Sequence, residues 1–217
     1  SLKSAIAKAE IRSLYTSRRF VKKLEQRGVD LSELLPQVQA HYLEDLKEEI
    51  GAITQLAVLA AETLLPARML YALYGRRVDI EQPAAILFSS GSEGEPKGVL
   101  LSHRNIMANI RQVADVLDVQ AEDNVMATLP LFHAFGLTVT GLMPLVEGIP
   151  AVCHPDPTDA LTRAKASAKH RATVFCSTST FLRLFSRNRH IHPLMLDSLR
   201  VVVSGAERLS PEIRDAF

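Results

Sequence analysis

The stretch that decides the fold is an apolar segment followed by a loop of small residues, Ile86-Leu87-Phe88-Ser89-Ser90-Gly91-Ser92-Glu93-Gly94-Glu95-Pro96-Lys97-Gly98. The apolar segment has the composition of a buried β-strand. Gly91, Gly94 and Gly98 allow backbone conformations in which successive N–H groups point inward. Lys97 adds a positive charge, and the serine hydroxyls add donors. The stretch therefore predicts a buried strand that opens into an anion-binding loop, with polyphosphate as the expected ligand.

Length and composition fit one globular α/β domain or part of a larger one. The 217 residues are 47% apolar and carry a formal net charge of +1. This near-neutral charge gives no reason to expect nucleic acid or an anionic membrane surface as a partner. Cys153 and Cys176 are expected to be free thiols in a reducing compartment. The most apolar long stretch, 53–74, contains charged residues and a proline, so we expect no membrane span.

Segments typical of strands and of helices alternate along the chain. Strands are expected at 11–15, 38–43, 84–88, 124–129, 151–153, 173–176 and 200–203. Helices are expected at 2–10, 18–27, 44–49, 53–74 with a bend or break at Pro66, 104–117, 137–145, 159–169, 177–187 and from 211 onward. Such alternation produces crossover units, so the sequence predicts an α/β fold with largely parallel sheets covered by helices. Ligands bind to such sheets at the carboxyl ends of the strands.

The two commonest phosphate-binding fingerprints do not fit the loop. Counting a Walker G-x-x-x-x-G-K-[ST] from Gly91, the second glycine position holds Pro96, and Lys97 is followed by Gly98. A Rossmann G-x-G-x-x-G is absent as well. The loop instead resembles the nucleotide loop of the adenylate-forming (AMP-binding) enzymes, which include acyl- and aryl-CoA synthetases, luciferases and peptide-synthetase adenylation domains. The family pattern is two small hydroxyl residues, Gly, Ser/Thr, Ser/Thr/Glu, Gly, any residue, Pro, Lys and Gly, and residues 89–98 match it at every position.

Further segments extend the resemblance beyond the loop. Residues 102–106 are similar to the helix opening that follows the family's loop. Residues 129–136, Leu-Pro-Leu-Phe-His-Ala-Phe-Gly, resemble the next family motif, where a histidine or aromatic residue borders the acyl-adenylate site. Residues 203–209 resemble the Gly-Gly-Ala-type turn near the adenine and acyl groups, with Ser204 in place of the commoner glycine.

The amino-acid sequence also resembles one branch of this family. That branch is the acyl-[acyl-carrier-protein] synthetase half of the bifunctional 2-acylglycerophosphoethanolamine acyltransferase/acyl-ACP synthetases. Residues 42–47, 86–94, 131–139 and 177–182 carry this similarity. It implies ATP-dependent ligation of a fatty acid to acyl carrier protein, linked to lysophospholipid reacylation. It also implies a cytoplasmic location, and leaves open whether the parent protein attaches to the inner membrane. A fatty acyl-CoA synthetase using coenzyme A is the alternative, and a non-catalytic nucleotide- or lipid-binding module is a second.

The resemblance implies a two-step reaction, in which a fatty carboxylate attacks the α-phosphate of ATP and a carrier thiol then displaces AMP. Loop donors, Lys97 and a bound Mg²⁺ would stabilise the charge on the departing pyrophosphate. Lys97 and His133 are the implied catalytic residues, and His133 would orient the carboxylate or the α-phosphate. The implied nucleotide-binding residues are Ser89, Ser90, Gly91, Ser92, Glu93, Gly94, Lys97, Gly205, Ala206 and Glu207.

Plainer interpretations stay open for two of these features. His133 can also be a packed histidine that caps the following helix, and Gly205 with Ala206 can be an ordinary strand-to-helix turn. No metal-ligating residues are assigned, because His190-x-His192 supplies too few ligands for a metal site of its own. The family's Tyr-Gly-x-Thr-Glu motif, its ribose-binding Asp and its mobile C-terminal domain with the catalytic Lys are not in the sequence. We therefore expect residues 1–217 to be a central fragment of the large N-terminal adenylation domain, folded but catalytically incomplete.

Overall fold

The computed structural model describes residues 2–32, 34–89 and 97–217, and the chain divides into two compact units. Unit 1 comprises residues 1–79 and 88–99, and unit 2 comprises residues 80–87 and 100–217. Most of the predicted anion-binding loop lies outside the described residues, namely Ser90, Gly91, Ser92, Glu93 and Gly94.

Unit 1 contains a small parallel pair of strands, β1 (Ser13–Thr16) and β2 (Gln39–Tyr42). Its helices are α1 (Leu2–Lys8), α2 (Arg18–Gln26), the 3-10 turn η1 (Leu35–Gln37), α3 (Leu43–Glu49), α4 (Ala52–Leu64) and α5 (Ala67–Tyr74). Helix α2 begins after Ser17, whose hydroxyl accepts a hydrogen bond from the N–H of Phe20 at 3.0 Å. The predicted break at Pro66 separates α4 from α5, because proline removes a helical N–H donor.

Strands β3 (Pro83–Ser89) and β4 (Lys97–Ser102) pair at the two ends of the anion-binding loop. The hydroxyl of Ser89 donates to the carbonyl oxygen of Lys97 at 3.5 Å, so the last residue of β3 lies beside the first residue of β4. The prediction of a buried strand is wrong here, because the residues of β3 are exposed or half-buried. Among the described residues β3 pairs only with β4, so it is not an inner strand of a layered sheet.

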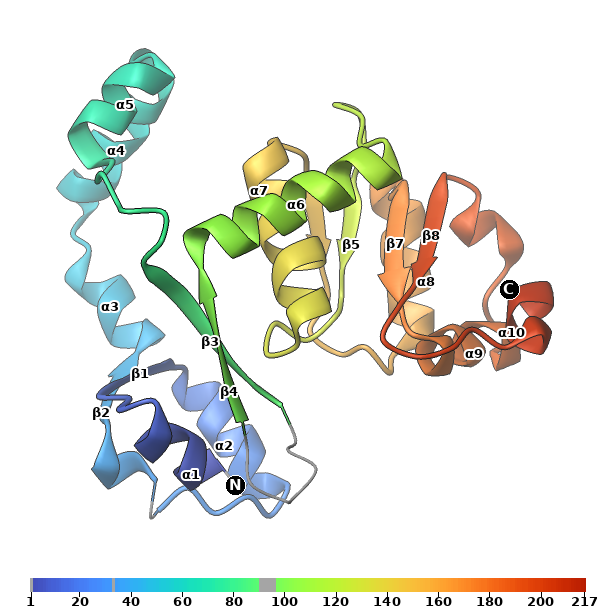
Figure 1. Cartoon of the computed structure of the whole chain (residues 1–217), viewed down its shortest axis with the longest axis horizontal. Coiled ribbons are helices and arrows are strands. Elements are labelled where there is room, and N and C mark those ends of the chain that lie inside the picture. The colour runs from blue at the N-terminus through green and yellow to red at the C-terminus, as the bar shows by residue number, and fades with distance from the viewer. Residues whose placement is uncertain (1, 33, 90–96) are drawn as a thin grey trace. The chain divides into compact units, whose positions relative to one another are not determined.

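Unit 2 is built on a four-stranded, entirely parallel sheet in the order β6-β5-β7-β8. Its strands are β5 (Val125–Ala127), β6 (Ala151–Cys153), β7 (Val174–Ser177) and β8 (Val201–Ser204). Its helices are α6 (His103–Leu117), the π-helix η2 (Gly136–Leu142), α7 (Met143–Glu147), α8 (Ala160–His170), α9 (Ser179–Arg187), the 3-10 turn η3 (Pro193–Leu196) and α10 (Pro211–Ala216). Figure 1 shows these strands between helices. The predicted α/β fold with a parallel sheet covered by helices is confirmed.

Both faces of this sheet are buried in hydrophobic cores. Val125 and Val174 pack on one face with residues of α6, η2 and α7. Met126 and Phe175, the next residue of each strand, pack on the other face with residues of α8, α9 and α10. Successive side chains of a strand point to opposite faces, so the continuous apolar runs of β5 and β7 serve two layers at once.

A charged network joins the amino ends of three strands. Asp123 is 2% exposed and accepts hydrogen bonds from the Thr173 hydroxyl at 2.6 Å and from Arg200 Nη2 at 2.5 Å. Asp123 lies just before β5, while Thr173 and Arg200 directly precede β7 and β8. Burial alone would raise the pKa of Asp123, but hydrogen bonds from Arg200, the Gln120 N–H and Thr173 outweigh it and hold the pKa below its ordinary value.

None of the helices in the described parts of the chain combines the length and the apolar composition needed to cross a membrane.

Candidate active site

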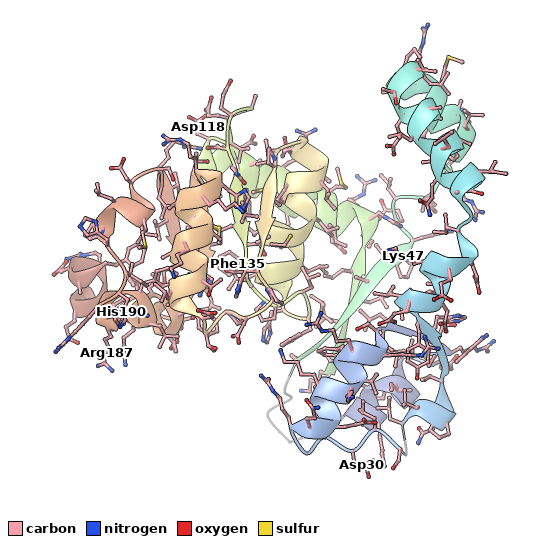
Figure 2. The ribbon with its side chains drawn as sticks, turned by 180° about the vertical axis from the view of Figure 1, so that it is seen from behind. Asp30, Lys47, Asp118, Phe135, Arg187 and His190 are labelled. Carbon is pink, nitrogen blue, oxygen red and sulfur yellow. The ribbon has the colours of Figure 1, made fainter. Side chains whose placement is uncertain are left out.

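A pocket of about 690 Å³ lies at the carboxyl edge of the sheet in unit 2. Three segments line it, and they follow β5, β7 and β8, which are adjacent strands. Its lining residues are Leu129, Pro130, His133, Ala134, Phe135, Gly136, Thr178, Thr180, Phe181, Gly205, Ala206 and Glu207. Figure 2 labels Phe135 within this unit. The carboxyl edge is where a parallel sheet binds ligands, so we take this pocket as the candidate site.

The segment after β5 turns back on itself at Gly136. A Cβ on Gly136 would lie 2.7 Å from the carbonyl carbon of Pro130 and closer still to its oxygen, so only glycine permits this approach. The N–H of His133 donates to the Pro130 carbonyl at 3.2 Å, and the N–H of Leu137 donates to the His133 carbonyl at 2.8 Å. The turn leaves the His133 side chain exposed at the pocket, with its ring centre 4.5 Å from that of Phe132.

A π-helix follows directly on this turn. In η2 the N–H of Met143 donates to the carbonyl of Thr138, five residues earlier, and the Thr138 hydroxyl donates to the Ala134 carbonyl at 2.7 Å. Turns of π-helix are rare and occur often at functional sites. The unusual helix therefore begins at the pocket wall that carries His133 and Phe135.

The turn after β8 contacts the segment after β5. A Cβ on Gly205 would lie 2.8 Å from Cε1 of Phe135, so the glycine allows the aromatic ring to lie against the turn. The N–H of Gly205 donates to the Ser177 carbonyl at 3.0 Å, which continues the pairing of β8 with β7. Ala206 has φ +65°, a left-handed conformation that few non-glycine residues adopt. The backbone conformation of this turn therefore depends on its contacts with Phe135 and Ser177 as well as on its own sequence.

Glu207 connects the same turn to the start of α9. Its carboxylate accepts hydrogen bonds from the N–H of Thr180 and, at 3.0 Å, from the Thr180 hydroxyl. These hydrogen bonds, that of the Thr180 backbone first, hold the pKa of Glu207 below its ordinary value. An anionic side chain at a helix N-terminus is also favoured by the helix dipole. Glu207 is thus ionised near neutral pH and braces two walls of the pocket.

The predicted site residues fall into three groups. His133, Gly205, Ala206 and Glu207 meet in the pocket of unit 2. Ser89 and Lys97 lie side by side at the ends of β3 and β4, in unit 1. The remaining loop residues are outside the described part of the chain, and their predicted role stays a prediction.

Three lining residues lie outside the segments that the sequence linked to the site, namely Thr178, Thr180 and Phe181. They follow β7, which neighbours β5 and β8. The rule that ligands bind at the carboxyl ends of strands, applied to this strand as well, would have found them. Within the described residues, no group of three or more His, Cys, Asp and Glu side chains could hold a metal ion.

Comparison with known proteins gives the family. The AMP-binding enzyme profile matches residues 2–217, so the chain belongs to the AMP-binding enzyme family. It is 35% identical over 137 residues to a sulfoacetate–CoA ligase of Cupriavidus necator, and the aligned region covers 63% of this chain and 26% of that protein. It is 30% identical over 144 residues to a long-chain-fatty-acid–CoA ligase of Bacillus subtilis, which covers 65% of this chain and 26% of that ligase. The matched part of this chain therefore spans about a quarter of the length of these relatives.

A solved structure confirms the fold over the whole chain. The fatty acyl-adenylate ligase from L. pneumophila, in complex with acyl adenylate and pyrophosphate, superposes with a TM-score of 0.74. The match covers 99% of this chain and 34% of that protein, at 20% identity. The likeness establishes the α/β architecture expected of an adenylate-forming enzyme.

Proposed function

We propose that the protein containing this chain is an acid–thiol ligase that activates a carboxylic acid with ATP. The observation that carries the proposal is the pocket at the carboxyl edge, where His133 and the Gly205–Glu207 turn come together. Membership in the AMP-binding enzyme family supports it. The pocket has room for a ligand of moderate size and combines aromatic, hydroxyl and backbone groups, which is the usual make-up of a small-molecule site.

In the proposed first step, a carboxylate oxygen of the acid attacks the α-phosphorus of ATP. A new phosphorus–oxygen bond forms, the bond to the β-phosphate oxygen breaks, and pyrophosphate leaves with the bonding electron pair. The exposed imidazole of His133 can donate a hydrogen bond to an oxygen of the carboxylate or the α-phosphate. In the second step, a thiolate attacks the acyl carbon and AMP leaves.

The phosphate tail of ATP belongs, in this proposal, to the loop between β3 and β4. Ser89 supplies a hydroxyl and Lys97 a positive charge at the two ends of that loop. The proposed contacts of Ser90, Gly91, Ser92, Glu93 and Gly94 rest on the family pattern alone. Charge on the leaving pyrophosphate would be stabilised by these donors.

Magnesium belongs to the proposal as the partner of the ATP phosphates. Within the described residues, no group of three or more His, Cys, Asp and Glu side chains could hold a metal ion. The ion would therefore be held largely by phosphate oxygens and water, and it would supply positive charge to the departing pyrophosphate.

We further propose a fatty acid as the substrate and acyl carrier protein as the thiol acceptor, in a protein linked to lysophospholipid reacylation. Residues 42–47, 131–139 and 177–182 support this finer assignment through their similarity to acyl-ACP synthetases. Coenzyme A is the second candidate acceptor, because the relatives named above are CoA ligases. Comparing holo-acyl carrier protein with coenzyme A in thioester formation would decide between them.

The proposed domain assignment places residues 1–217 in the centre of an N-terminal adenylation domain. The test is fatty-acid-dependent exchange of radiolabelled pyrophosphate into ATP, in the 217-residue chain and in a protein extended to the length of its relatives. We expect exchange in the longer protein, loss of most of it in His133→Ala, and little in the short chain. Absence of exchange in the longer protein with every acid tried would refute the ligase. Robust exchange by the short chain would refute its description as an incomplete fragment.

A further inference from the structure

Arg163 is a charged side chain in the interior of unit 2. It lies in α8, has 0% relative exposure, and sits in the hydrophobic layer on the α8–α9 face of the sheet. Its guanidinium carbon is 5.0 Å from the ring centres of Phe175 and Phe185 and 5.9 Å from that of Phe181. Burial lowers the pKa of Arg163 to about 10, so the group remains charged at neutral pH. Placing a cation here is unfavourable unless its contacts repay the lost hydration.

The contacts of Arg163 go to the segments that leave the sheet at its carboxyl edge. Nη2 donates to the hydroxyl of Thr128 at 2.9 Å, and Nη1 donates to the carbonyl of Pro157. Thr128 directly follows β5 and precedes the pocket residues Leu129 and Pro130. Pro157 lies in the segment between β6 and α8. One guanidinium thus links the ends of two neighbouring strands.

The third connection runs to the aromatic wall of the pocket. Phe175 belongs to β7, and Phe181, which lines the pocket, lies in the first turn of α9. A cation over an aromatic ring is held by the ring's negative face, most strongly when it is shielded from water. Nε of Arg163 has no hydrogen-bond partner among the described residues, so the group is not a fully satisfied structural bridge. Attraction to Asp156 and Asp159 offsets part of the cost of burying the charge, whereas an apolar side chain of similar volume would avoid that cost altogether.

We propose that Arg163 is a positioning residue, which holds the His133 segment and the Phe181 wall in the arrangement that binds the acyl-adenylate. This inference rests on the proposed function for the identity of the ligand, and on the contacts of Arg163 for the positioning. Arg163 itself does not line the pocket. It acts through Thr128, Pro157 and the phenylalanine rings.

The test measures amide hydrogen exchange of the whole chain in Arg163→Met, Arg163→Lys and Thr128→Val, with Asp123→Asn as the matched control. Asp123 braces the amino ends of the same sheet, so its variant reports general loosening. We expect exchange in residues 129–136 and 154–159 to rise about tenfold in Arg163→Met, and less in Arg163→Lys and Thr128→Val. Asp123→Asn should raise exchange in these segments no more than in the rest of unit 2, at a temperature where it is folded.

Binding of a dodecanoyl-sulfamoyl adenosine, an inert mimic of acyl-adenylate, is measured in parallel. We expect about tenfold weaker binding in Arg163→Met, whereas the control binds like the wild type. Wild-type exchange and affinity in a folded Arg163→Met would overturn the proposal, and so would equal effects of Asp123→Asn. If the wild type fails to bind the mimic while amide exchange rises in Arg163→Met as expected, the positioning role is supported and the proposed ligand is refuted. Thr128→Val keeps the test decisive if Arg163→Met does not fold.

Discussion

Gly136→Ala is expected to damage both the stability of unit 2 and the candidate site. The added Cβ would meet the backbone carbonyl of Pro130, 2.7 Å from its carbon, where real Cβ contacts are essentially never below 3.0 Å. The obstacle is backbone, so no side-chain rotation relieves it, and the segment after β5 must move away from the π-helix. Forced overpacking of this kind costs about 3 kcal/mol. For a chain of this size that corresponds to a loss of about 6–12 °C in Tm.

Thermal unfolding followed by circular dichroism measures this loss, with Gly141→Ala as the control. Gly141 lies in the same π-helix, and a Cβ there would meet the end of the exposed side chain of Leu131, which can rotate aside, and the carbonyl oxygen of Gly136 at 3.3 Å, which a small shift relieves. We expect the control to change the free energy of unfolding by less than about 1 kcal/mol. A Gly136→Ala protein whose Tm lies within about 2 °C of the wild type would refute the reasoning. The close contact between residue 136 and the Pro130 carbonyl would then be free to relax.

Three further predictions concern side chains whose ionisation the structure perturbs. The pKa of Asp123 is lowered in the folded state, so its contribution to stability is present above about pH 4 and is lost as the pH falls through the folded-state pKa. Asp123→Asn should therefore lower the free energy of unfolding by about 2 kcal/mol at pH 7. Urea titrations of this variant should show a weaker fall in stability below about pH 4 than those of the wild type. Glu207→Gln should lower the free energy of unfolding by less than about 1 kcal/mol, because this carboxylate is exposed, and a loss of several kcal/mol in the same titration would contradict that view. Burial raises the pKa of Cys176 to about 12, so Ellman's reagent should modify only the exposed Cys153 in the native chain; rapid reaction of both thiols would contradict the burial of Cys176.

Local chemistry determined much of this protein from the sequence alone. The predicted starts of α2, α6 and α10 lie within one residue of those in the structure, because Ser17, Ser102 and Ser210 each satisfy a free N–H of the first turn, which is a property of neighbouring residues. The alternation of strands and helices likewise predicted the parallel sheet, since crossover connections leave little choice of topology. His133 and the Gly205 turn could be predicted as site residues because each follows a strand and matches a family motif.

The tertiary structure decided which segments meet and what lies behind them. The order β6-β5-β7-β8 places β7 between the two strands whose motifs the sequence revealed, and so brings Thr178, Thr180 and Phe181 into the pocket. Arg163 carries no sequence signal, because an arginine within a helix usually faces water. Its burial, its hydrogen bond to Thr128 and its three aromatic neighbours arise only when α8 packs on the sheet. Side-chain period and capping are local properties, whereas contacts between distant segments depend on how the layers pack, and for that reason only the folded chain defines the pocket.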